Sequence, residues 1–314
     1  MTIDTKYINS FIHATERAAY GASLYKGKNN KIAADQAAVD EMRNQLNKID
    51  MRGRIVIGEG ELDEAPMLYV GERVGNNFGE EFDIAVDPLE GTNFAAQNLP
   101  NALSVLAVTK KGNLLYAPET YMEKIAIGSN LPKNLIDLDF GIKKNVELLS
   151  EAKNVSPDKL TACILKRPRH KEIIDVLYSL KVKINFITDG DVSGVISVAD
   201  QNSSTDIYLG IGGGPEGVLA AAALSCLNCQ MQTRLVLQND DEKNKVIKAG
   251  IKDLSKKYSI EDMVKDDVIF CATGVTDGDI VSGIKNVDNA FESETFVLHK
   301  KSGTNKKVKN CSDK

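Results

Sequence analysis

Five acidic side chains of this sequence stand at the start or end of apolar segments. A carboxylate in such a place is costly to bury unless it is paired or binds a metal ion. In the stretch 82–93, FDIAVDPLEGTN, an apolar run leads directly to two acids and a threonine. This stretch is therefore either an ordinary exposed turn or a site. The five acids are Asp35, Glu59, Asp87, Glu90 and Glu216.

The residue types favour a metal site built from oxygen ligands. Mg²⁺ and Mn²⁺ prefer carboxylate and carbonyl oxygens, and the chain has only 3 His, which disfavours zinc. Two such ions, about 3.5–4 Å apart, can hold both the attacking water and the leaving oxygen of a phosphate ester. We expect Asp87 and Glu90 to bridge the ions from either side of a turn that Pro88 enforces. As a hypothesis, the Leu89 carbonyl faces the metal as well.

Two neighbouring positions have a functional and a structural interpretation. If a helix begins after Gly91, its free N–H groups form an anion site, and Thr92 could position the attacking water. Thr92 could equally be only the N-cap of that helix. The neighbouring acids are what favours the functional role of Thr92. Asp35 falls on the apolar stripe of a helix predicted for 32–49, beside Ile32 and Val39. It is either functional or an acid near the helix start that the helix dipole favours.

Three further segments indicate phosphate or sugar binding. The loop 210–217, GIGGGPEG, fails the dinucleotide pattern because Pro215 stands where glycine is needed. It could cradle a phosphate or form a tight structural turn. In 166–170, KRPRH, Arg167 and Arg169 can bind phosphate in bidentate fashion, and a surface cluster is the alternative. In 189–191, DGD, Asp189 and Asp191 could accept hydrogen bonds from sugar hydroxyls or cap the next helix.

The pattern of elements predicts an α/β protein. Strands are expected at 54–57, 82–86, 103–108, 114–117 and 124–128, and alternating strands and helices follow after about residue 160. A polar segment at 129–160 suggests a boundary between an N-terminal half, 1–160, and a C-terminal half, 161–314. Ligands of such sheets gather beyond the carboxyl ends of strands, where Asp189, Asp191, the glycine loop and Thr276-Asp277 are expected.

The composition is that of an ordinary globular protein without a nucleic-acid footprint, with 42% hydrophobic residues and a net charge of −5 over 314 residues. The apolar run 217–227 is shorter than the about 20 residues that span a bilayer, and no signal peptide is expected.

The odd number of cysteines, 5, suggests the cytoplasm. The pair Cys226 and Cys229 is interpreted as packing rather than zinc binding. The lysine-rich stretch 300–310 predicts a solvated strand or tail rather than a polyanion site.

These motifs resemble a known family. D-P-L-E-G-T at 87–92, an upstream E-G-E at 59–61 and a helical Asp before it are similar to the lithium-sensitive, metal-dependent phosphatase superfamily, which usually has Asp where Glu90 stands. Together with VIGEGELDEAPML at 56–68, ETYMEKIAIG at 119–128, GIGGGPEGVLAA at 210–221 and CATGVTDGD at 271–279, they resemble class II fructose-1,6-bisphosphatase. The resemblance covers nearly the whole chain.

The resemblance implies an α/β/α/β/α sandwich that hydrolyses the 1-phosphate of fructose 1,6-bisphosphate in gluconeogenesis. It implies Mn²⁺, with Mg²⁺ as a possible replacement, and a homo-oligomer, dimer or tetramer. Thr92, Asp87 and Glu59 would be catalytic, with Thr92 orienting or deprotonating the water, and Lys31 could help to hold phosphate. The implied metal ligands are Asp35, Glu59, Asp87, Glu90 and Glu216. The implied substrate contacts are Glu90, Gly91, Thr92, Tyr121, Arg167, Arg169, Asp189, Asp191 and Gly213.

Other functions are consistent with parts of the sequence. A broader sugar bisphosphatase that also cleaves sedoheptulose 1,7-bisphosphate is the nearest alternative, followed by phosphatases for inositol monophosphate or 3′-phosphoadenosine phosphate. A nucleotide-binding regulator or dehydrogenase is disfavoured by the failed glycine pattern. The full set of acids disfavours a non-catalytic metal-binding subunit.

Overall fold

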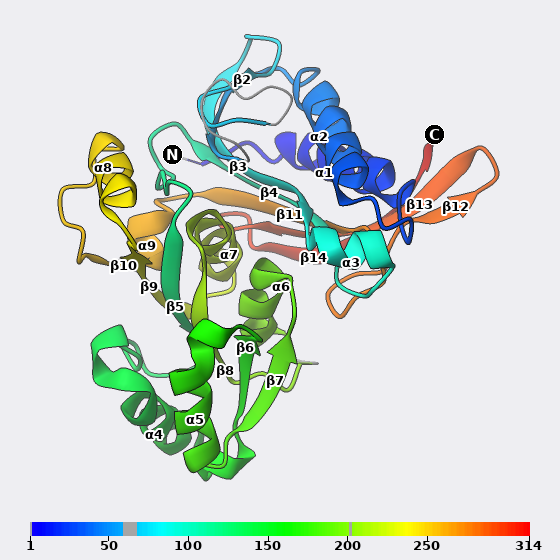
Figure 1. Ribbon diagram of the computed structural model, residues 1–314. Coiled ribbons are helices and arrows are strands. Elements are labelled where there is room, and N and C mark those ends of the chain that lie inside the picture. Colours follow the sequence, from blue (N-terminus) through cyan, green and yellow to red (C-terminus); the bar gives the residue numbers. More distant parts are fainter. Residues whose placement is uncertain (1, 59–67, 201–202) are drawn as a thin grey trace. The chain divides into compact units, whose positions relative to one another are not determined.

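The computed structural model describes residues 2–58, 68–200 and 203–314. These residues form two compact units (Figure 1), of which the first is discontinuous in sequence, with residues 1–115 and 264–314, and the second is residues 116–263. The sequence suggested a division near residue 160 instead. That position lies inside the second unit because strand β5 (Tyr121–Ile127) pairs with strands that follow residue 160. The polar segment before it contains helix α4 (Gly141–Lys153).

The first unit contains an eight-stranded mixed sheet in the order β12-β13-β11-β4-β3-β1-β2, with β14 paired to β13. Only the β1–β3 pairing is parallel among those described. Strands before residue 115 and after residue 264 share this sheet, since β4 pairs with β11. The strands are β1 (Met51–Ile57), β2 (Arg73–Val74), β3 (Glu80–Glu90), β4 (Leu103–Lys110), β11 (Val268–Gly274), β12 (Lys285–Val287), β13 (Ala290–His299) and β14 (Thr304–Asp313).

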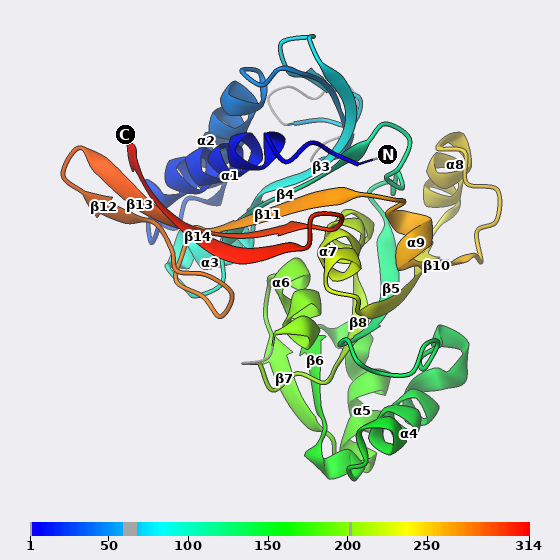
Figure 2. The same cartoon turned by 180° about the vertical axis from the view of Figure 1, so that it is seen from behind.

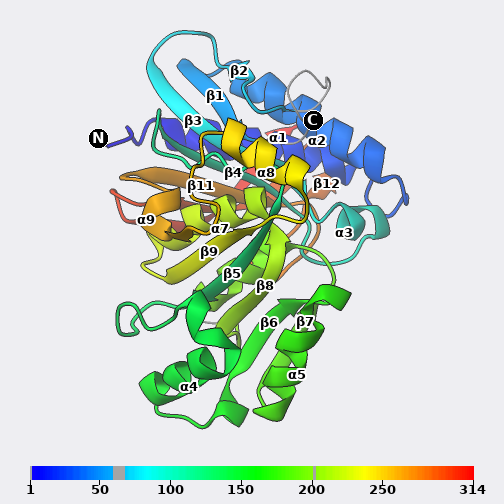
Figure 3. The ribbon, with the colours of Figure 1, turned by 60° about the vertical axis from the view of Figure 1, so that its left-hand side comes forward.

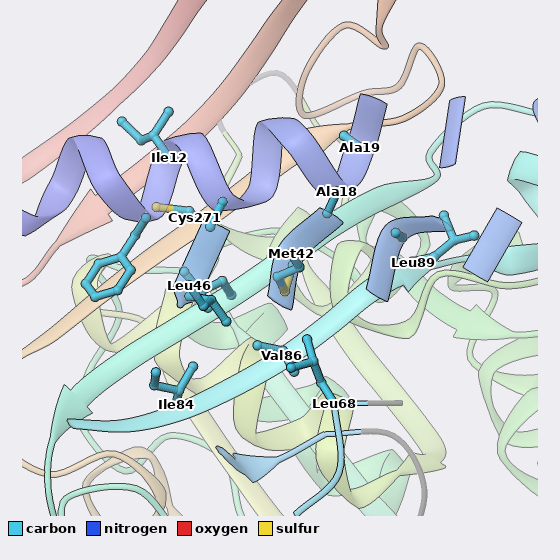
Figure 4. Packing of buried hydrophobic residues seen from close by; sticks show 14 of the residues in the cluster. Ile12, Ala18, Ala19, Met42, Leu46, Leu68, Ile84, Val86, Leu89 and Cys271 are labelled. Atoms are coloured by element: carbon cyan, nitrogen blue, oxygen red, sulfur yellow. The ribbon is translucent and has the colours of Figure 1, made fainter. Parts of the chain in front are cut away.

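Helices α1 (Tyr7–Ser23) and α2 (Lys31–Leu46) cover one face of this sheet. Figure 4 shows Met42 of α2 facing Val86 of β3, with Ala18 of α1 beside Met42. The predicted helix at 32–49 is confirmed in position, but Ile32 does not belong to its buried stripe, because its side chain is 84% exposed.

A buried carboxylate fastens three segments of the first unit together. Asp267 accepts hydrogen bonds from the backbone N–H groups of Ile3, Val268 and Lys301, at 2.8, 3.0 and 3.0 Å. It also lies 2.9 Å from His299 Nε2. The N-terminal segment, β11 and the β13–β14 turn therefore meet at one side chain. Strands β13 and β14 pair as a long antiparallel hairpin (Figure 2). The lysine-rich stretch therefore belongs mostly to strand β14 and is not a loose tail.

The second unit contains a six-stranded mixed sheet in the order β10-β9-β5-β8-β6-β7. Its strands besides β5 are β6 (Thr161–Leu165), β7 (Lys183–Ile187), β8 (Ile207–Gly213), β9 (Gln230–Val236) and β10 (Lys257–Ser259). The predicted strand at 114–117 is absent from the described residues, and Leu114 forms only an isolated bridge with Val264. Two mixed sheets with packed helices confirm the α/β class.

Helices lie on both faces of the second sheet (Figure 3). Side chains of α4 and α5 (Lys171–Ser179) join one apolar core with Ile125 and Leu209. Helices α6 (Asp191–Ile196) and α7 (Gly214–Cys226) pack against the other face. The remaining helices are α3 (Thr92–Gln97) in the first unit and α8 (Asp240–Lys248) and α9 (Ile260–Met263) in the second, with short 3₁₀ turns at 138–140, 157–159, 168–170 and 197–199.

Candidate functional site

Strand β3 carries two of the candidate acids and does not end before them. It runs through Asp87 to Glu90 and pairs with β4. Asp87 lies opposite Val105 and Glu90 lies opposite Leu103, so three steps along β3 match two along β4. One extra residue on one strand is a β-bulge. The predicted turn is therefore wrong, and Pro88 lies in a bulge, where its missing N–H is tolerated.

The bulge brings the two acids to one face of the sheet. Residues two apart on a strand share a face, and directly paired residues of neighbouring strands point to the same side. Leu103 and Val105 are two apart, so Glu90 and Asp87 share a face although they are three apart in sequence. This face is opposite to that of Val86, which packs under α1 and α2. The Glu90 side chain is buried and Asp87 is half-buried.

Helix α3 begins at Thr92, directly after the bulge. Gly91 is its N-cap, with a φ of 77° in the left-handed region, where residues with a Cβ are strained. A Cβ on Gly91 would also lie 2.9 Å from Phe94 Cδ2. The alternative interpretation of Thr92 as the N-cap is therefore wrong, because Thr92 is the first helical residue and is half-buried. The helix has 6 residues, and we assign no anion site to it.

Asp35 lies in the second turn of α2 and is half-buried. The helix starts at Lys31, which is exposed, and the Asn30 side chain accepts a hydrogen bond from Ala33 N at 3.1 Å. The helix dipole acts mainly on charges in the first turn. Asp35 lies beyond that turn, so the dipole does not explain an acid at this position. Glu59 lies outside the described residues.

No three His, Cys, Asp or Glu side chains of the described ranges are grouped so that they could hold a metal ion. Glu59 falls in the gap at 59–67, and each unit is described by itself.

The loop at Thr276-Asp277 has a structural role in the first unit. The Thr276 hydroxyl accepts a hydrogen bond from Ala102 N at 2.9 Å. The Asp277 backbone carbonyl accepts one from Asn101 N, and its carboxylate accepts one from Gly283 N, at 3.0 and 2.9 Å. This loop thereby holds the segment that enters β4 beside the bulge.

In the second unit, the glycine-rich segment surrounds carboxylates of the chain itself. Residues up to Gly213 complete β8, and α7 begins at Gly214. A Cβ on Gly212 would lie 2.0 Å from Asp191 Oδ2, and a Cβ on Gly213 would lie 1.9 Å from Glu216 Oε2. These glycines are needed because two acidic side chains pack directly against the strand. The sequence did not predict that these carboxylates lie against the glycine-rich segment, and binding of a phosphate there stays a prediction.

Asp191 is buried and bound from two sides. Lys124 Nζ donates to its Oδ2, and the Tyr208 hydroxyl donates to its Oδ1. Lys124 is itself fully buried on β5. The sequence did not identify Lys124 or Tyr208 as partners of Asp191. The signal that could have indicated Lys124 was a single lysine in the otherwise apolar strand KIAI at 124–127.

Glu216 lies in the first turn of α7, after Pro215. Its Oε2 atom is buried and has no hydrogen-bond partner among the described residues. Loss of surrounding water raises the pKa of the Glu216 carboxyl, while the positive charge of Lys124 lowers it and the negative charge of Asp191 raises it further. An oxygen in this position is suited to binding a cation.

Tyr121 and Arg169 form a second cluster at the same end of β8. The Arg169 guanidinium carbon lies 4.6 Å from the Tyr121 ring centroid. Arg169 Nε and Nη2 both donate to the Ile211 carbonyl, at 2.9 and 2.8 Å. Tyr121 also pairs with Gly213 across the β5–β8 register. The structure thus brings together three of the predicted substrate contacts, Tyr121, Arg169 and Gly213.

A buried histidine, which the sequence did not single out, supports this cluster. His170 Nδ1 donates to the Leu165 carbonyl at 2.6 Å, and its Nε2 accepts from Ile211 N at 2.8 Å. Burial lowers the pKa of His170, so the ring is neutral at pH 7. The His170 side chain therefore attaches the segment that carries Arg167 and Arg169 to β8. Arg167 is only half-buried and donates to the Lys166 carbonyl, while Asp189 precedes α6.

The cysteines favour the packing interpretation. All five are free, and Cys226 ends α7 while Cys229 is buried. Burial raises the pKa of the Cys229 thiol to about 12. Among the helices of the described residues, none combines the length and apolar character needed to cross a bilayer.

Residues 5–312 match the family model described as bacterial fructose-1,6-bisphosphatase, glpX-encoded. The fructose-1,6-bisphosphatase class 2 of Haemophilus influenzae is 43% identical over 312 residues, 95% of this chain and 93% of that protein. The fructose-1,6-bisphosphatase 1 class 2 of Escherichia coli K12 is 41% identical over 311 residues, covering 95% and 92%. Among solved structures, the extragenic suppressor protein suhB of Bartonella henselae aligns with 62% of this chain and 74% of its own, at 12% identity and a TM-score of 0.35.

Proposed function

Since this chain belongs to the family of bacterial, glpX-encoded fructose-1,6-bisphosphatases, we propose that it hydrolyses the 1-phosphate of fructose 1,6-bisphosphate, with carboxylates that hold divalent cations. The products are fructose 6-phosphate and phosphate, and the role is gluconeogenic. The observation that carries the site assignment is the bulge in β3, which puts Asp87 and Glu90 on one face beside Thr92.

The donor chemistry fits Mn²⁺ or Mg²⁺. The proposed ligands are all carboxylates, as hard cations prefer, and Glu216 offers a buried oxygen without a hydrogen-bond partner among the described residues. Asp35 and Glu59 complete the proposed set. Bound cations would supply positive charge that neutralises the phosphate and makes water more acidic.

The other residues bind and orient the substrate. Thr92 orients the attacking water, with a neighbouring carboxylate as the proton acceptor. Arg167, Arg169 and Tyr121 bind the distant 6-phosphate, and Arg169 is already held by the Tyr121 ring and the Ile211 carbonyl. Because these side chains are already in place, the free energy of binding the 6-phosphate can help to position the 1-phosphate for hydrolysis.

Further proposed substrate contacts are Glu90, Gly91, Asp189, Asp191 and Gly213. Assembly as a dimer or tetramer is also a proposal, which light scattering would test. The five free cysteines support a reducing compartment such as the cytoplasm.

The test is phosphate release from fructose 1,6-bisphosphate, with Mn²⁺ or Mg²⁺ titrated in and with lithium as an inhibitor. We expect Asp87→Asn to lose about 10³-fold or more in turnover, since a metal ligand contributes several kcal/mol. Asp83→Asn is the matched control on the same strand, because Asp83 instead accepts a hydrogen bond from Gly112 N. Normal turnover of Asp87→Asn at low Mn²⁺ would refute the site.

Substrate range needs its own measurement. The wild-type enzyme should be compared on fructose 1,6-bisphosphate, sedoheptulose 1,7-bisphosphate, inositol monophosphate and 3′-phosphoadenosine phosphate. A higher kcat/KM for inositol monophosphate than for the bisphosphorylated sugars would refute the proposed second phosphate grip.

A further inference from the structure

Lys124 is an unusual residue at its position. It lies on β5, opposite Gly210 of β8, and its side chain is completely buried. Lysine is almost never fully buried unless it is paired, and an unpaired buried ammonium costs several kcal/mol. The residues around it must therefore supply negative charge.

The partner of Lys124 is Asp191, at the start of α6. Lys124 Nζ binds Asp191 Oδ2, and the Tyr208 hydroxyl binds Oδ1. Both carboxylate oxygens are thus held by side chains from two adjacent strands, β5 and β8. Gly212 lets the carboxylate sit against β8, because a Cβ there would lie 2.0 Å from Oδ2.

The first turn of α7, which carries Glu216, lies next to Lys124. A Cβ on Gly217 would lie 3.1 Å from Lys124 Cε and 3.7 Å from Nζ, so this turn packs directly over the lysine side chain. The Lys124 ammonium is therefore paired with Asp191 and lies beside the helix turn that carries Glu216.

We propose that Lys124 is a positioning residue that holds the Asp191 carboxylate in place for the substrate and, by packing against the first turn of α7, keeps Glu216 in place for the cation. The inference rests on the proposed function, which assigns Asp191 to the sugar and Glu216 to the metal. Without Lys124, the Asp191 carboxylate would be buried without its counter-charge, beside the turn that carries Glu216. Such a carboxylate is no longer held in one position, and the packing of the adjacent turn would change with it.

The purely structural alternative makes a different prediction. If Lys124 only fills space, methionine should replace it well, because buried ion pairs can often be exchanged for apolar residues of similar volume. If it positions the acids, Lys124→Met should lower kcat about 10²-fold, the order of loss for a catalytic group displaced by about 1 Å.

The experiment compares wild type, Lys124→Met, Tyr208→Phe and the control Lys257→Met. Lys257 binds Asp137 and Asp139 in the same unit, each at 2.6 Å, and has no proposed catalytic role. Each protein is measured for kcat, KM, the Mn²⁺ concentration for half-maximal activity, and the rise in Tm that Mn²⁺ causes without substrate.

We expect Lys124→Met to show the loss in kcat and a smaller Mn²⁺-induced rise in Tm, and Tyr208→Phe to raise KM several-fold. Lys257→Met should match wild type in kcat and metal response. If Lys124→Met does not fold, the double variant Lys124→Met/Asp191→Asn removes both charges and is tested for the Mn²⁺-induced rise alone, where a reduced rise supports the proposal.

Wild-type kcat and metal response in Lys124→Met, or a wild-type metal response in the double variant, would overturn the proposal. A larger rise in Tm with Mn²⁺ would also overturn it, since Lys124 would then compete with the cation. A wild-type protein that releases no phosphate from fructose 1,6-bisphosphate would instead refute the proposed function, and the inference would fall with it.

Discussion

Replacement of Gly213 by alanine should lower turnover strongly while the protein stays folded. The φ of Gly213 is −63°, which any L residue can adopt, so the change adds no backbone strain. The new Cβ would lie 1.9 Å from Glu216 Oε2 and 2.6 Å from its Cδ. Contact between carbon and oxygen needs about 3.3 Å, so the carboxylate oxygen must move by about 1.4 Å.

The two consequences of this movement differ in size. Glu216 can move by changing its side-chain torsions, at a cost of about 0.5–1.5 kcal/mol, so Tm should fall by only about 1–6 °C. A catalytic group displaced by about 1 Å costs about 10²-fold in rate, which corresponds to about 2.7 kcal/mol of transition-state stabilisation.

The assay is phosphate release at saturating substrate over a range of Mn²⁺ concentrations, together with thermal unfolding. Gly214→Ala is the matched control, because its Cβ would lie 3.2 Å from the Thr120 carbonyl and should leave kcat within about twofold. Wild-type kcat in Gly213→Ala would refute the reasoning. A fall in kcat with unchanged Mn²⁺ dependence would also refute it, since the displaced group would then not be a metal ligand.

Three further predictions follow from described contacts. Arg169→Ala should raise KM about 10²-fold with kcat nearly unchanged, because a charge-assisted contact to phosphate is lost; initial-rate kinetics that show only a fall in kcat would contradict this. Asp267→Ala should lower the free energy of unfolding by about 3 kcal/mol or more, because three backbone donors lose their acceptor; an unchanged urea midpoint would argue against it. Alkylation of the native protein at pH 8 should modify exposed Cys311 and spare Cys163 and Cys229, whose pKa burial raises to about 12; mass spectrometry that shows equal modification would contradict this.

The sequence predicted the elements better than their junctions. The family resemblance is confirmed, and so are most strands, because apolar runs and flanking turn residues determine them locally. The stretch 82–93 was predicted to end its strand before Asp87, whereas the strand continues through a bulge to Glu90. A bulge depends on the register with β4, which is a pairing between distant segments and leaves no local pattern.

The second unit shows a similar limit. The glycine loop was interpreted as a place where a ligand approaches the backbone closely, and the structure places the Asp191 and Glu216 carboxylates against the glycines at 212 and 213. Lys124 was overlooked because its neighbours in sequence are apolar, while its partners come from α6 and α7. Charge compensation in a buried cluster is decided by tertiary packing and cannot be deduced from spacing alone.

The discontinuous first unit has a consequence for synthesis on the ribosome. Its sheet needs β11 and β13, which are translated after the second unit, so β3 and β4 remain without these partners while the second unit emerges. The continuous second unit can complete all its pairings earlier, which reverses the usual N-terminal-first order of co-translational folding. Nascent chains of this protein should therefore depend on chaperones until the β13–β14 hairpin leaves the exit tunnel.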